Sequence, residues 1–585
     1  MGVAMFIDFF INPKNVLHKQ YEALRSFYVD GRLADDVAKQ YGYTKSAFYS
    51  LVRDFKIRMQ SKDFNLAEHF FKTPVAGRRV RSDTMATKDL IIELRKKHYS
   101  VPDIKTFLDA DGRQISERHI YTILMGEGFV RLPRRDKTEK ASLAINPKTL
   151  AAPKAQILKI TKPEKFTSNA CGVLIFLPYI VTLGLDKLIS ASLYPETTQL
   201  SRINSILSFV TLKLTNVCRY STDDLWCMDR GLGLFAGLNV LPKASWYTSY
   251  SNRITREMNL SFLRGMSTIW QEHGLLSDSI NMDFVTVPYW GEESHLENNW
   301  SGTRHHALSS MLAALAHDPD SGIITYGDST IRHEDESATA VEFLDFYKKS
   351  GNANIKYLIF DSKFTTYQNL KKLDDSEVCF ITIRRRGKKI IEELAALDKK
   401  QWKKVKVPMA HGRTRHLTIH EQLVFINSYG RELRQIAITG HGKIKPALII
   451  TNDFETAVAD IIRKYARRWL VEKTIAEQTH FFHLNRLSSS MVIKVDFDLT
   501  MTILAHNLYR LLAQDLPGFT NCTAQSLYNK FINNSGYVEI EENNIVVKLK
   551  KKRNLPMILE AMQQYSANVP WIKKSKISFH GASMS

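Results

Sequence analysis

Two similar patterns of hydrophobic positions occupy residues 1–135. In the first, Gly42 interrupts a helical pattern and Thr44 is placed to cap the next helix. The apolar positions on the inner face of these two predicted helices are Ala34, Val37, Ala38, Phe48, Leu51 and Val52. Helix, glycine turn and helix is the order of a helix-turn-helix, which we predict within residues 1–75.

The second pattern repeats this order within residues 76–135. Ser100 caps a helix, Gly112 ends it, and Ser116 caps the following helix. Such a motif places its second helix in the major groove of DNA. The polar positions that we expect to face DNA are Lys45, Arg53, Arg118 and His119. The repeat, and the basic Arg131, Arg134 and Arg135 after it, favour DNA binding over the alternative of two helical bundles that contact protein.

The pattern changes several times further along the chain. Residues 136–165 are rich in Lys, Pro and Ala and predict a basic linker, and residues 166–277 predict a helical domain. From residue 278, strands are followed by helix, strand, helix and strand, which is typical of a mixed α/β sheet. The segment 304–318 is compatible with a strand or a helix.

The last third of the chain predicts an insertion, two helices and a hairpin. Residues 391–452 contain four strand patterns, a β-rich insertion, and one long helix follows from about residue 455 to residue 484. An apolar helix is predicted over 499–513. We expect segments 278–390 and 453–515 to form one core, and residues 516–585 to form a C-terminal region. That region contains a hairpin that turns at Asn543–Asn544 and ends in the basic Lys550–Arg553.

Composition narrows the class of function. A chain of 585 residues is too long for a single hydrophobic core, so several domains are expected. Its formal net charge of +21 favours a polyanionic partner, most often nucleic acid, although a basic enzyme without such a partner has the same composition. The five cysteines form no CxxC pair, which argues against a zinc site and for a reducing compartment. The longest apolar run, Cys171–Leu185, is short for a membrane span, and we expect a cytoplasmic protein.

Two aspartates lie at strand positions where a carboxylate has consequences. Asp283 lies within an apolar strand pattern, where burying a charge is costly unless it is paired or bound to metal. Asp361 ends another strand pattern, at the edge of an α/β sheet where ligands gather. Each aspartate alone is more often a helix cap or a turn residue.

The predicted long helix carries a polar stripe. Tyr465, Arg468, Glu472 and Thr479 recur at spacings that place them on one helical face. The alternative is an ordinary Arg–Glu pair four residues apart. Three carboxylates from two strands and one helix can hold two hard cations, which activate water or a 3′-hydroxyl and stabilise the leaving oxygen in phosphodiester cleavage.

The order of strand aspartate, strand aspartate, β-rich insertion and helix glutamate resembles the DDE transposases of bacterial insertion sequences. The segment "YARRWLVEKTIAEQTH" is similar to their tyrosine–arginine–glutamate–lysine signature, with Thr479 in place of the lysine. Lys473, His480 and His483 are candidates to substitute for that lysine. "DFVTVPYWG", "LIFDSKFTTYQNL" and "FITIRRRG" resemble the two aspartate regions and the strand that follows them. The resemblance covers about residues 165–515.

This resemblance implies a ribonuclease-H-like core in which Asp283, Asp361 and Glu472 are catalytic and hold Mg²⁺, or Mn²⁺ as a substitute. It implies that the helix-turn-helix modules bind terminal inverted repeats, that the core cuts the ends and joins them to target DNA, and that a homodimer pairs two ends at the nucleoid. A non-catalytic DNA-binding regulator, an inactive or domesticated copy, and a metal-dependent nuclease without joining are the rivals. The presence of all three acids favours the enzyme.

Further polar residues have weaker predictions. Tyr465, Arg468 and Lys473 are expected to support the site or contact phosphate, and Arg384, Arg385 and Arg386 to follow the DNA backbone, unless they form a solvated basic edge. Trp402 is more typical of a core residue than of a base-stacking one. Five nearby residues are placed outside the site: Asp278 in a turn, Asp328 in a loop, Glu477 on another helix face, and His305 and His306 at the surface.

Overall fold

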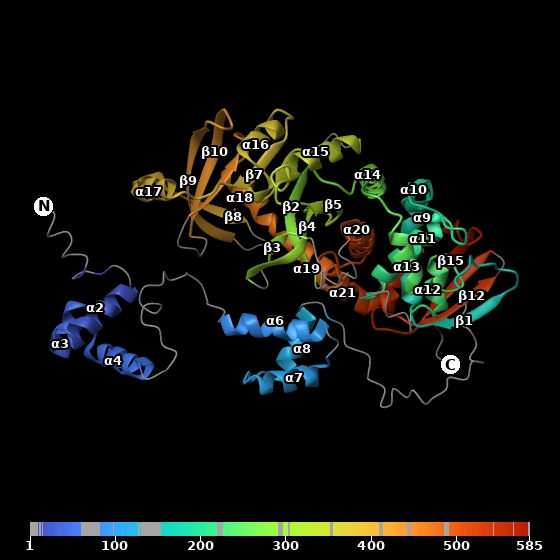
Figure 1. Cartoon of the computed structure of the whole chain (residues 1–585). Coiled ribbons are helices and arrows are strands. Elements are labelled where there is room, and N and C mark those ends of the chain that lie inside the picture. Colours follow the sequence, from blue (N-terminus) through green and yellow to red (C-terminus); the bar gives the residue numbers. More distant parts are fainter. Residues whose placement is uncertain are drawn as a thin grey trace. The chain divides into compact units, whose positions relative to one another are not determined.

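The computed structural model of the chain divides into two compact units, Met1–Thr87 and Lys88–Ser585 (Figure 1). It describes residues 10, 13, 16–59, 82–96, 99–126, 129, 154–218, 226–289, 296–301, 305–351, 355–408, 414–440, 446–484, 491–541, 543–565 and 567–582. Most of the predicted linker, residues 136–153, lies outside this described part, as do Arg131, Arg134 and Arg135.

The first unit has a small core formed by three helices. Gly42 turns the chain between the second and third helices with a φ of 63°, which glycine adopts without strain. The hydroxyl oxygen of Thr44 accepts a hydrogen bond from the N–H of Ala47 at 3.2 Å and caps the third helix. Val37, Ala38, Phe48 and Val52 are buried, as their spacing predicts. The helices are α2 (Val16–Tyr28), α3 (Ala34–Gln40) and α4 (Lys45–Met59).

The next three helices also enclose a core of their own. Ser100 and Asp103 form a capping box, in which the N–H of Asp103 donates to the Ser100 hydroxyl at 3.3 Å and the N–H of Ser100 donates to the Asp103 carboxylate at 2.9 Å. Gly112 turns the chain with a φ of 74°, and Ser116 accepts a hydrogen bond from the N–H of His119. The helices are α6 (Ser82–Lys96), α7 (Val101–Ala110) and α8 (Glu117–Gly126).

A large mixed sheet forms the centre of the second unit. Its first part has the order β5-β4-β2-β6-β7, in which β5, β4 and β2 are antiparallel neighbours and β2, β6 and β7 are parallel. The prediction of a mixed α/β architecture is therefore confirmed, and the ambiguous segment 304–318 is a strand. The bounds are β2 (Ser279–Pro288), β4 (His306–His317), β5 (Ile324–Ile331), β6 (Tyr357–Ile359) and β7 (Cys379–Ile383).

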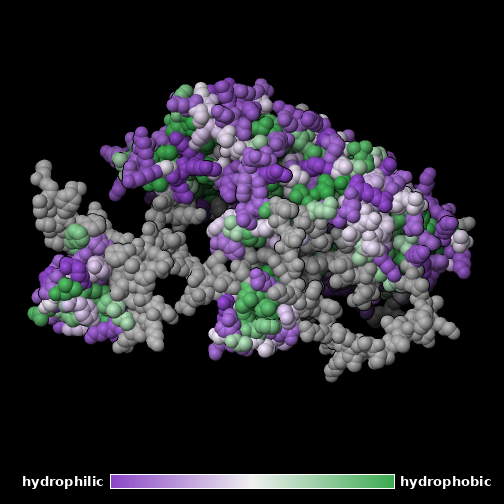
Figure 2. Space-filling model, in the orientation of Figure 1, coloured by the Kyte–Doolittle hydropathy of each residue, from purple (hydrophilic) through white to green (hydrophobic). Residues whose placement is uncertain are grey.

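The strands predicted after residue 402 extend this same sheet. β11 pairs antiparallel with β7, and β10, β9 and β8 follow outward in that order. A short helix, α17 (Lys388–Ala396), precedes them, and hydrophilic side chains predominate over it on the face shown in Figure 2. The edge strand β3 (Asn298–Ser301) pairs with β4 at the opposite end. The added strands are β8 (Lys403–Pro408), β9 (Thr414–Ile426), β10 (Arg431–Thr439) and β11 (Ala447–Thr451).

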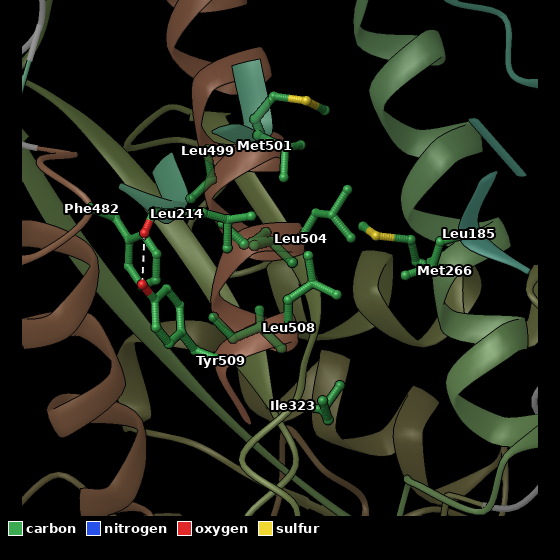
Figure 3. Close-up of a cluster of buried hydrophobic side chains, with 14 of the residues drawn as sticks. Leu185, Leu214, Met266, Ile323, Phe482, Leu499, Met501, Leu504, Leu508 and Tyr509 are labelled. Carbon is green, nitrogen blue, oxygen red and sulfur yellow. Dashed lines mark hydrogen bonds between the residues drawn. The ribbon is translucent and has the colours of Figure 1, made fainter. Parts of the chain in front are cut away.

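An apolar helix, α20 (Val492–Asp515), packs against β5 and links the sheet to the helices that precede it. Figure 3 shows Leu499, Leu504 and Leu508 of α20 among side chains from other elements. Tyr509 donates a hydrogen bond to the carbonyl of Leu214 at 2.6 Å, so its hydroxyl is satisfied although it is buried. The buried apolar side chains between Cys171 and Leu263 thus belong to the same hydrophobic core as those of the sheet. The helices of this region are α9 (Leu177–Thr182), α10 (Leu185–Ala191), α11 (Arg202–Leu214), α12 (Arg230–Phe235), α13 (Ala244–Ser251) and α14 (Arg256–Glu272).

The C-terminal residues form a second, smaller sheet. The predicted hairpin is present, but Asn544, which was expected in the turn, is the first residue of the second strand and pairs with Glu541. The first strand of the hairpin also pairs with β1 (Glu164–Ser168). The sequence predicted a linker up to residue 165, but Glu164 and Lys165 belong to β1. The prediction is wrong there because β1 pairs with a strand more than 350 residues later in the chain. The other strands are β12 (Gly536–Glu541), β13 (Asn544–Leu549), β14 (Asn568–Val569) and β15 (Ser575–Gly581).

Within the described residues, no single helix is long and apolar enough to cross a bilayer. One bent pair, Cys171–Thr182 with Leu185–Ala191, passes by length and composition alone. Its apolar residues include Val173, Leu174, Ile180 and Leu185, which are buried in the main core.

Candidate active site

Asp283 and Asp361 reach the same edge of the central sheet. β2 and β6 are parallel neighbours, and Asn281 pairs with Ile359. Each aspartate lies two residues further along its strand direction, Asp283 within β2 and Asp361 just past the end of β6, so the two occupy adjacent positions on neighbouring strands. Phe284 of β2 stacks on Phe364 with the ring centroids 3.7 Å apart, which holds the segment after β6 against β2.

Hydrogen bonds from the backbone orient both carboxylates. The N–H of Phe284 donates to Asp283 at 2.9 Å, and the N–H of Ser362 donates to Asp361 at 2.5 Å. Asp361 thereby caps a short 3₁₀ turn, Ser362–Phe364. Asp361 therefore does act as a helix cap, which was the alternative interpretation of this residue. The cap uses one carboxylate oxygen and leaves the other available for a ligand.

The predicted single helix after the insertion is wrong, because the chain forms two helices that meet at Arg468. These are α18 (Val458–Arg467) and α19 (Trp469–His480). The side-chain amide of the buried Asn281 donates to the carbonyl of Arg467 at 2.9 Å and fixes this junction against β2. Glu472 lies in the first turn of α19, and Arg468 lies where its side chain reaches β2.

Arg468 bridges two of the three predicted catalytic acids. Its guanidinium donates to a carboxylate oxygen of Asp283 and, at 3.0 Å, to Glu472. The Arg468 and Asp283 side chains are only 13% and 18% exposed, so solvent screens their ion pair weakly. Tyr465 lies beside the same guanidinium, whose central carbon is 5.8 Å from the ring centroid.

Burial dominates the electrostatics of this cluster. It raises the pKa of Asp283, and the nearby negative charge of Glu472 acts in the same direction, while Arg468 opposes the shift. Burial likewise raises the pKa of Tyr465 to about 12, so its phenol is protonated at neutral pH. Burial alone would lower the pKa of the Arg468 guanidinium, but Asp283, Tyr465 and Glu472 together raise it, and the group remains charged.

The three acids line one cleft of about 820 Å³. Asp283, Asp361 and Glu472 come to it from β2, from the end of β6 and from α19. Other lining side chains, which the sequence did not single out, are Trp300, His333, Glu336 and Lys363. Lys363 stands two residues after Asp361, a position that a search for cations near the acids would have found. Trp300 follows a polar run with no such signal.

The carboxylates fit a divalent cation by their chemistry. Carboxylate oxygens are the hard ligands that Mg²⁺ and Mn²⁺ prefer, and two of these acids already converge on one cationic group. Across the described residues, however, no three His, Cys, Asp or Glu side chains are gathered closely enough to hold an ion. An ion between Asp283 and Glu472 therefore requires the guanidinium of Arg468 to leave that space.

Thr479, which stands where the signature has lysine, and the three candidates to replace that lysine do not all lie at the cleft. Thr479 and His480 line the cleft, whereas the exposed Lys473 is not among its lining residues. His483 is buried and hydrogen-bonded to the side chain of Asn216. Of the three candidates to replace the missing lysine, only His480 is at the cleft.

Several neighbouring residues lie where the sequence placed them. Asp278 is exposed, 4.0 Å from Lys464. Glu477 points away from the cleft and accepts a hydrogen bond from the N–H of Ala524. His305 is exposed, and Trp402 packs against a small apolar cluster with Leu394.

The prediction for Asp328 is wrong. It lies within β5, is 7% exposed, and pairs with Arg256 at 2.9 Å. The hydrophobic strand around it supplied no signal for this partner, which comes from α14.

The residues predicted to contact DNA are either exposed or bonded to other parts of the protein. Arg384 donates to Gln435 and Arg386 donates to the carbonyl of Pro446. Lys45 pairs with Asp35 at 2.9 Å on the first unit. Arg53, Arg118 and His119 are exposed on their helices.

Comparison with known families supplies an independent assignment for this part of the chain. Residues 282–508 match the family model described as a transposase DDE domain. The match contains Asp283, Asp361, Arg468 and Glu472, and such a domain implies a ribonuclease-H-like α/β core, in line with the mixed sheet. No curated protein matches the chain.

Proposed function

We propose that the chain is a DDE transposase of an insertion sequence, which cuts the ends of its element and joins them to target DNA; the match of residues 282–508 to a transposase DDE domain supports this. One observation carries the proposal: Asp283, Asp361 and Glu472 line a single cleft inside that domain. Phosphoryl transfer places negative charge on the phosphoryl oxygens, so an enzyme for it needs positioned carboxylates, cations and an open cleft.

Asp283, Asp361 and Glu472 would hold Mg²⁺, or Mn²⁺ as a substitute. When bound, two such ions lower the pKa of an attacking water or 3′-hydroxyl and offset the charge on the leaving oxygen. The protein orients two of the carboxylates through the N–H groups of Phe284 and Ser362. Arg468 neutralises Asp283 and Glu472 without a metal, and its guanidinium is placed to meet a DNA phosphate once it leaves them.

The helical modules before the core are the proposed readers of the inverted repeats. Each has the order helix, glycine turn and helix, and each exposes basic residues on its last helix: Lys45 and Arg53 on α4, Arg118 and His119 on α8. The net charge of +21 supports duplex DNA as the partner. Because two ends are paired before joining, we propose that the acting form is a homodimer.

Cleavage of supercoiled plasmid that carries the element's inverted repeats tests this function. Wild type and Asp361→Ala are compared with Mg²⁺ and with EDTA, and end binding is measured in parallel by gel shift. Cleavage that requires both the metal and Asp361, with end binding retained in the variant, supports the enzyme. A wild type that binds ends and never cuts contradicts it and identifies a DNA-binding regulator or an inactive copy.

Cleavage and joining use the same carboxylates, so a second assay separates a transposase from a nuclease. A pre-cut end with a free 3′-hydroxyl is incubated with target plasmid and Mn²⁺. Covalent joining supports the transposase, and cleavage without joining supports the nuclease.

A further inference from the structure

A second cleft adjoins the candidate active site. Its volume is about 590 Å³, and it shares His333, Glu336 and Lys363 with the first cleft. Because they share these side chains the two clefts adjoin, and Asp361 lines the first of them. We name the two clefts together the strand groove and define it by Trp300 in the first cleft, the shared Lys363, and Thr366 and Arg385 in the second.

The second part of the strand groove is suited to anions. Its lining includes the hydroxyl residues Ser337, Ser362, Thr365, Thr366 and Ser428. Lys363 and Arg385 are exposed, and neither forms an ion pair with any other described residue. Arg385 differs here from its neighbours Arg384 and Arg386, which are hydrogen-bonded to Gln435 and Pro446. Glu336 is the acidic residue at the junction of the two clefts, and the two cations outnumber it.

The first part of the strand groove presents an aromatic surface. Trp300 lies on the edge strand β3 and is 58% exposed. Its backbone is held, because its carbonyl accepts a hydrogen bond from Thr286 at 3.0 Å and the adjacent Asn299 is bonded to Ser310 and His333. The indole of Trp300 therefore stands on a held strand with its ring open to the first cleft, where a flat aromatic partner can stack on it.

We propose that the strand groove holds one unpaired strand of DNA next to the phosphate that reacts. Trp300 stacks on a base of that strand in the first cleft. Lys363 and Arg385 contact its phosphates, and the hydroxyl of Thr366 lines the same cleft as both cations. An aromatic platform combined with cations along a groove is how proteins hold single strands, since a paired and stacked base exposes no ring face. This inference rests on the proposed function and deepens it, because it assigns the strand that the site receives.

Binding measured in EDTA tests the groove without cleavage. The probes are a fluorescent duplex of the element's end with a single-stranded overhang and the same end as a blunt duplex, both added to the full chain. We expect Trp300→Ala to weaken overhang binding roughly tenfold or more, Trp300→Phe to restore part of it, and blunt-end binding to stay unchanged. Lys363→Ala and Arg385→Ala should each lower the salt dependence of overhang binding by about one phosphate contact.

Two exposed residues outside the groove provide matched controls. Phe454→Ala removes an exposed aromatic ring, and Lys348→Ala removes an exposed cation of α15 (Thr339–Lys349). Both should bind the overhang as wild type does. A 2-aminopurine base in the overhang gives a second readout, with quenching expected in the wild type and lost in Trp300→Ala.

Three results would overturn the inference. In the first, the groove variants bind the overhang as tightly as wild type does. In the second, they lose equal affinity for overhang and blunt ends, which would indicate that the groove binds duplex DNA. In the third, the wild type does not bind the overhang. The result is independent of the plasmid assay. If the chain binds the overhang through Trp300 but never cuts DNA, the inference about the strand groove stands and the proposed function is refuted. If the chain cuts DNA and Trp300→Ala binds the overhang as wild type does, the proposed function stands and the inference is refuted.

Discussion

The guanidinium of Arg468 donates a hydrogen bond to the carboxylate of Asp283, which lies 185 positions earlier in the chain. The same guanidinium binds Glu472, so one positive charge neutralises much of the repulsion between two acids in a partly buried cleft. A divalent cation that binds both acids must compete with this arginine.

Replacing Arg468 by Gln should tighten the binding of Mn²⁺ in the absence of DNA. A charge-assisted hydrogen bond to a carboxylate contributes about 1.5–3 kcal/mol, so relief of the competition should lower the Kd roughly tenfold or more. Titration calorimetry measures this Kd. Arg264→Gln, which removes an arginine paired to Glu257 on α14, is the matched control and should leave the Kd unchanged. An unchanged or weaker affinity in Arg468→Gln would show that the arginine does not compete with the metal.

Glu472→Gln should abolish end cleavage while end binding persists. The metal supplies several kcal/mol of transition-state stabilisation, and each 1.36 kcal/mol lost costs a factor of ten, so the rate should fall at least roughly a hundredfold. Glu477→Gln on the same helix is the control, because that side chain is directed to Ala524 and not to the cleft. Single-turnover cleavage compares the two. Equal losses in both variants would mean that α19 is merely damaged by either change.

Arg256→Met should destabilise the second unit strongly. Arg256 donates to both carboxylate oxygens of Asp496, at 2.7 and 2.8 Å, and Asp496 is fully buried. Removing one partner of a buried pair leaves an uncompensated charge and costs about 3–5 kcal/mol. Urea unfolding followed by tryptophan fluorescence measures the loss. Arg264→Met, at a more exposed pair, should cost about 1 kcal/mol or less. A similar small loss for Arg256→Met would show that Asp496 finds another partner or is protonated.

Asp453 should contribute stability that disappears in acid. Burial by itself would raise the pKa of this carboxyl, but hydrogen bonds from Thr456, Tyr357 and the N–H of Glu455 lower it to about 2. A carboxyl whose pKa is lower in the folded state stabilises the fold above its unfolded pKa, near 3.8, and loses that contribution as the pH falls toward about 2.

The comparison of wild type with Asp453→Asn checks this sign. The difference in their midpoints of thermal unfolding should be constant near neutral pH and shrink as the pH drops below about 4. A difference that grows in acid would contradict the direction of the shift. The same comparison with Glu539→Gln, at an exposed pair with Lys165 and Lys548, shows how far a surface carboxylate changes the midpoint of unfolding with pH.

The sequence by itself determined most of the local structure and pointed to the acids of the candidate site. Glycine turns and capping residues located the paired helices around Gly42 and Gly112, and alternating apolar residues located the strands. Local periodicity placed Asp283 and Asp361 at strands and Glu472 on a helix, and the resemblance to the DDE transposases then singled them out as the candidate catalytic acids. The four-residue spacing of Arg468 and Glu472 also indicated an ion pair, which the sequence offered as the alternative to a site and which the structure contains.

Only the tertiary structure decided what depends on segments far apart in the chain. Asn281 of β2 accompanies the break at Arg468 with a hydrogen bond to the carbonyl of Arg467, and Asp328 is buried beside its ion-pair partner Arg256. The pairing of β1 with β12 and the meeting of Trp300, Lys363 and Asp361 in one hollow are likewise long-range. No local pattern encodes such partners, because their energy arises from side chains and strand edges that meet only when the chain has folded.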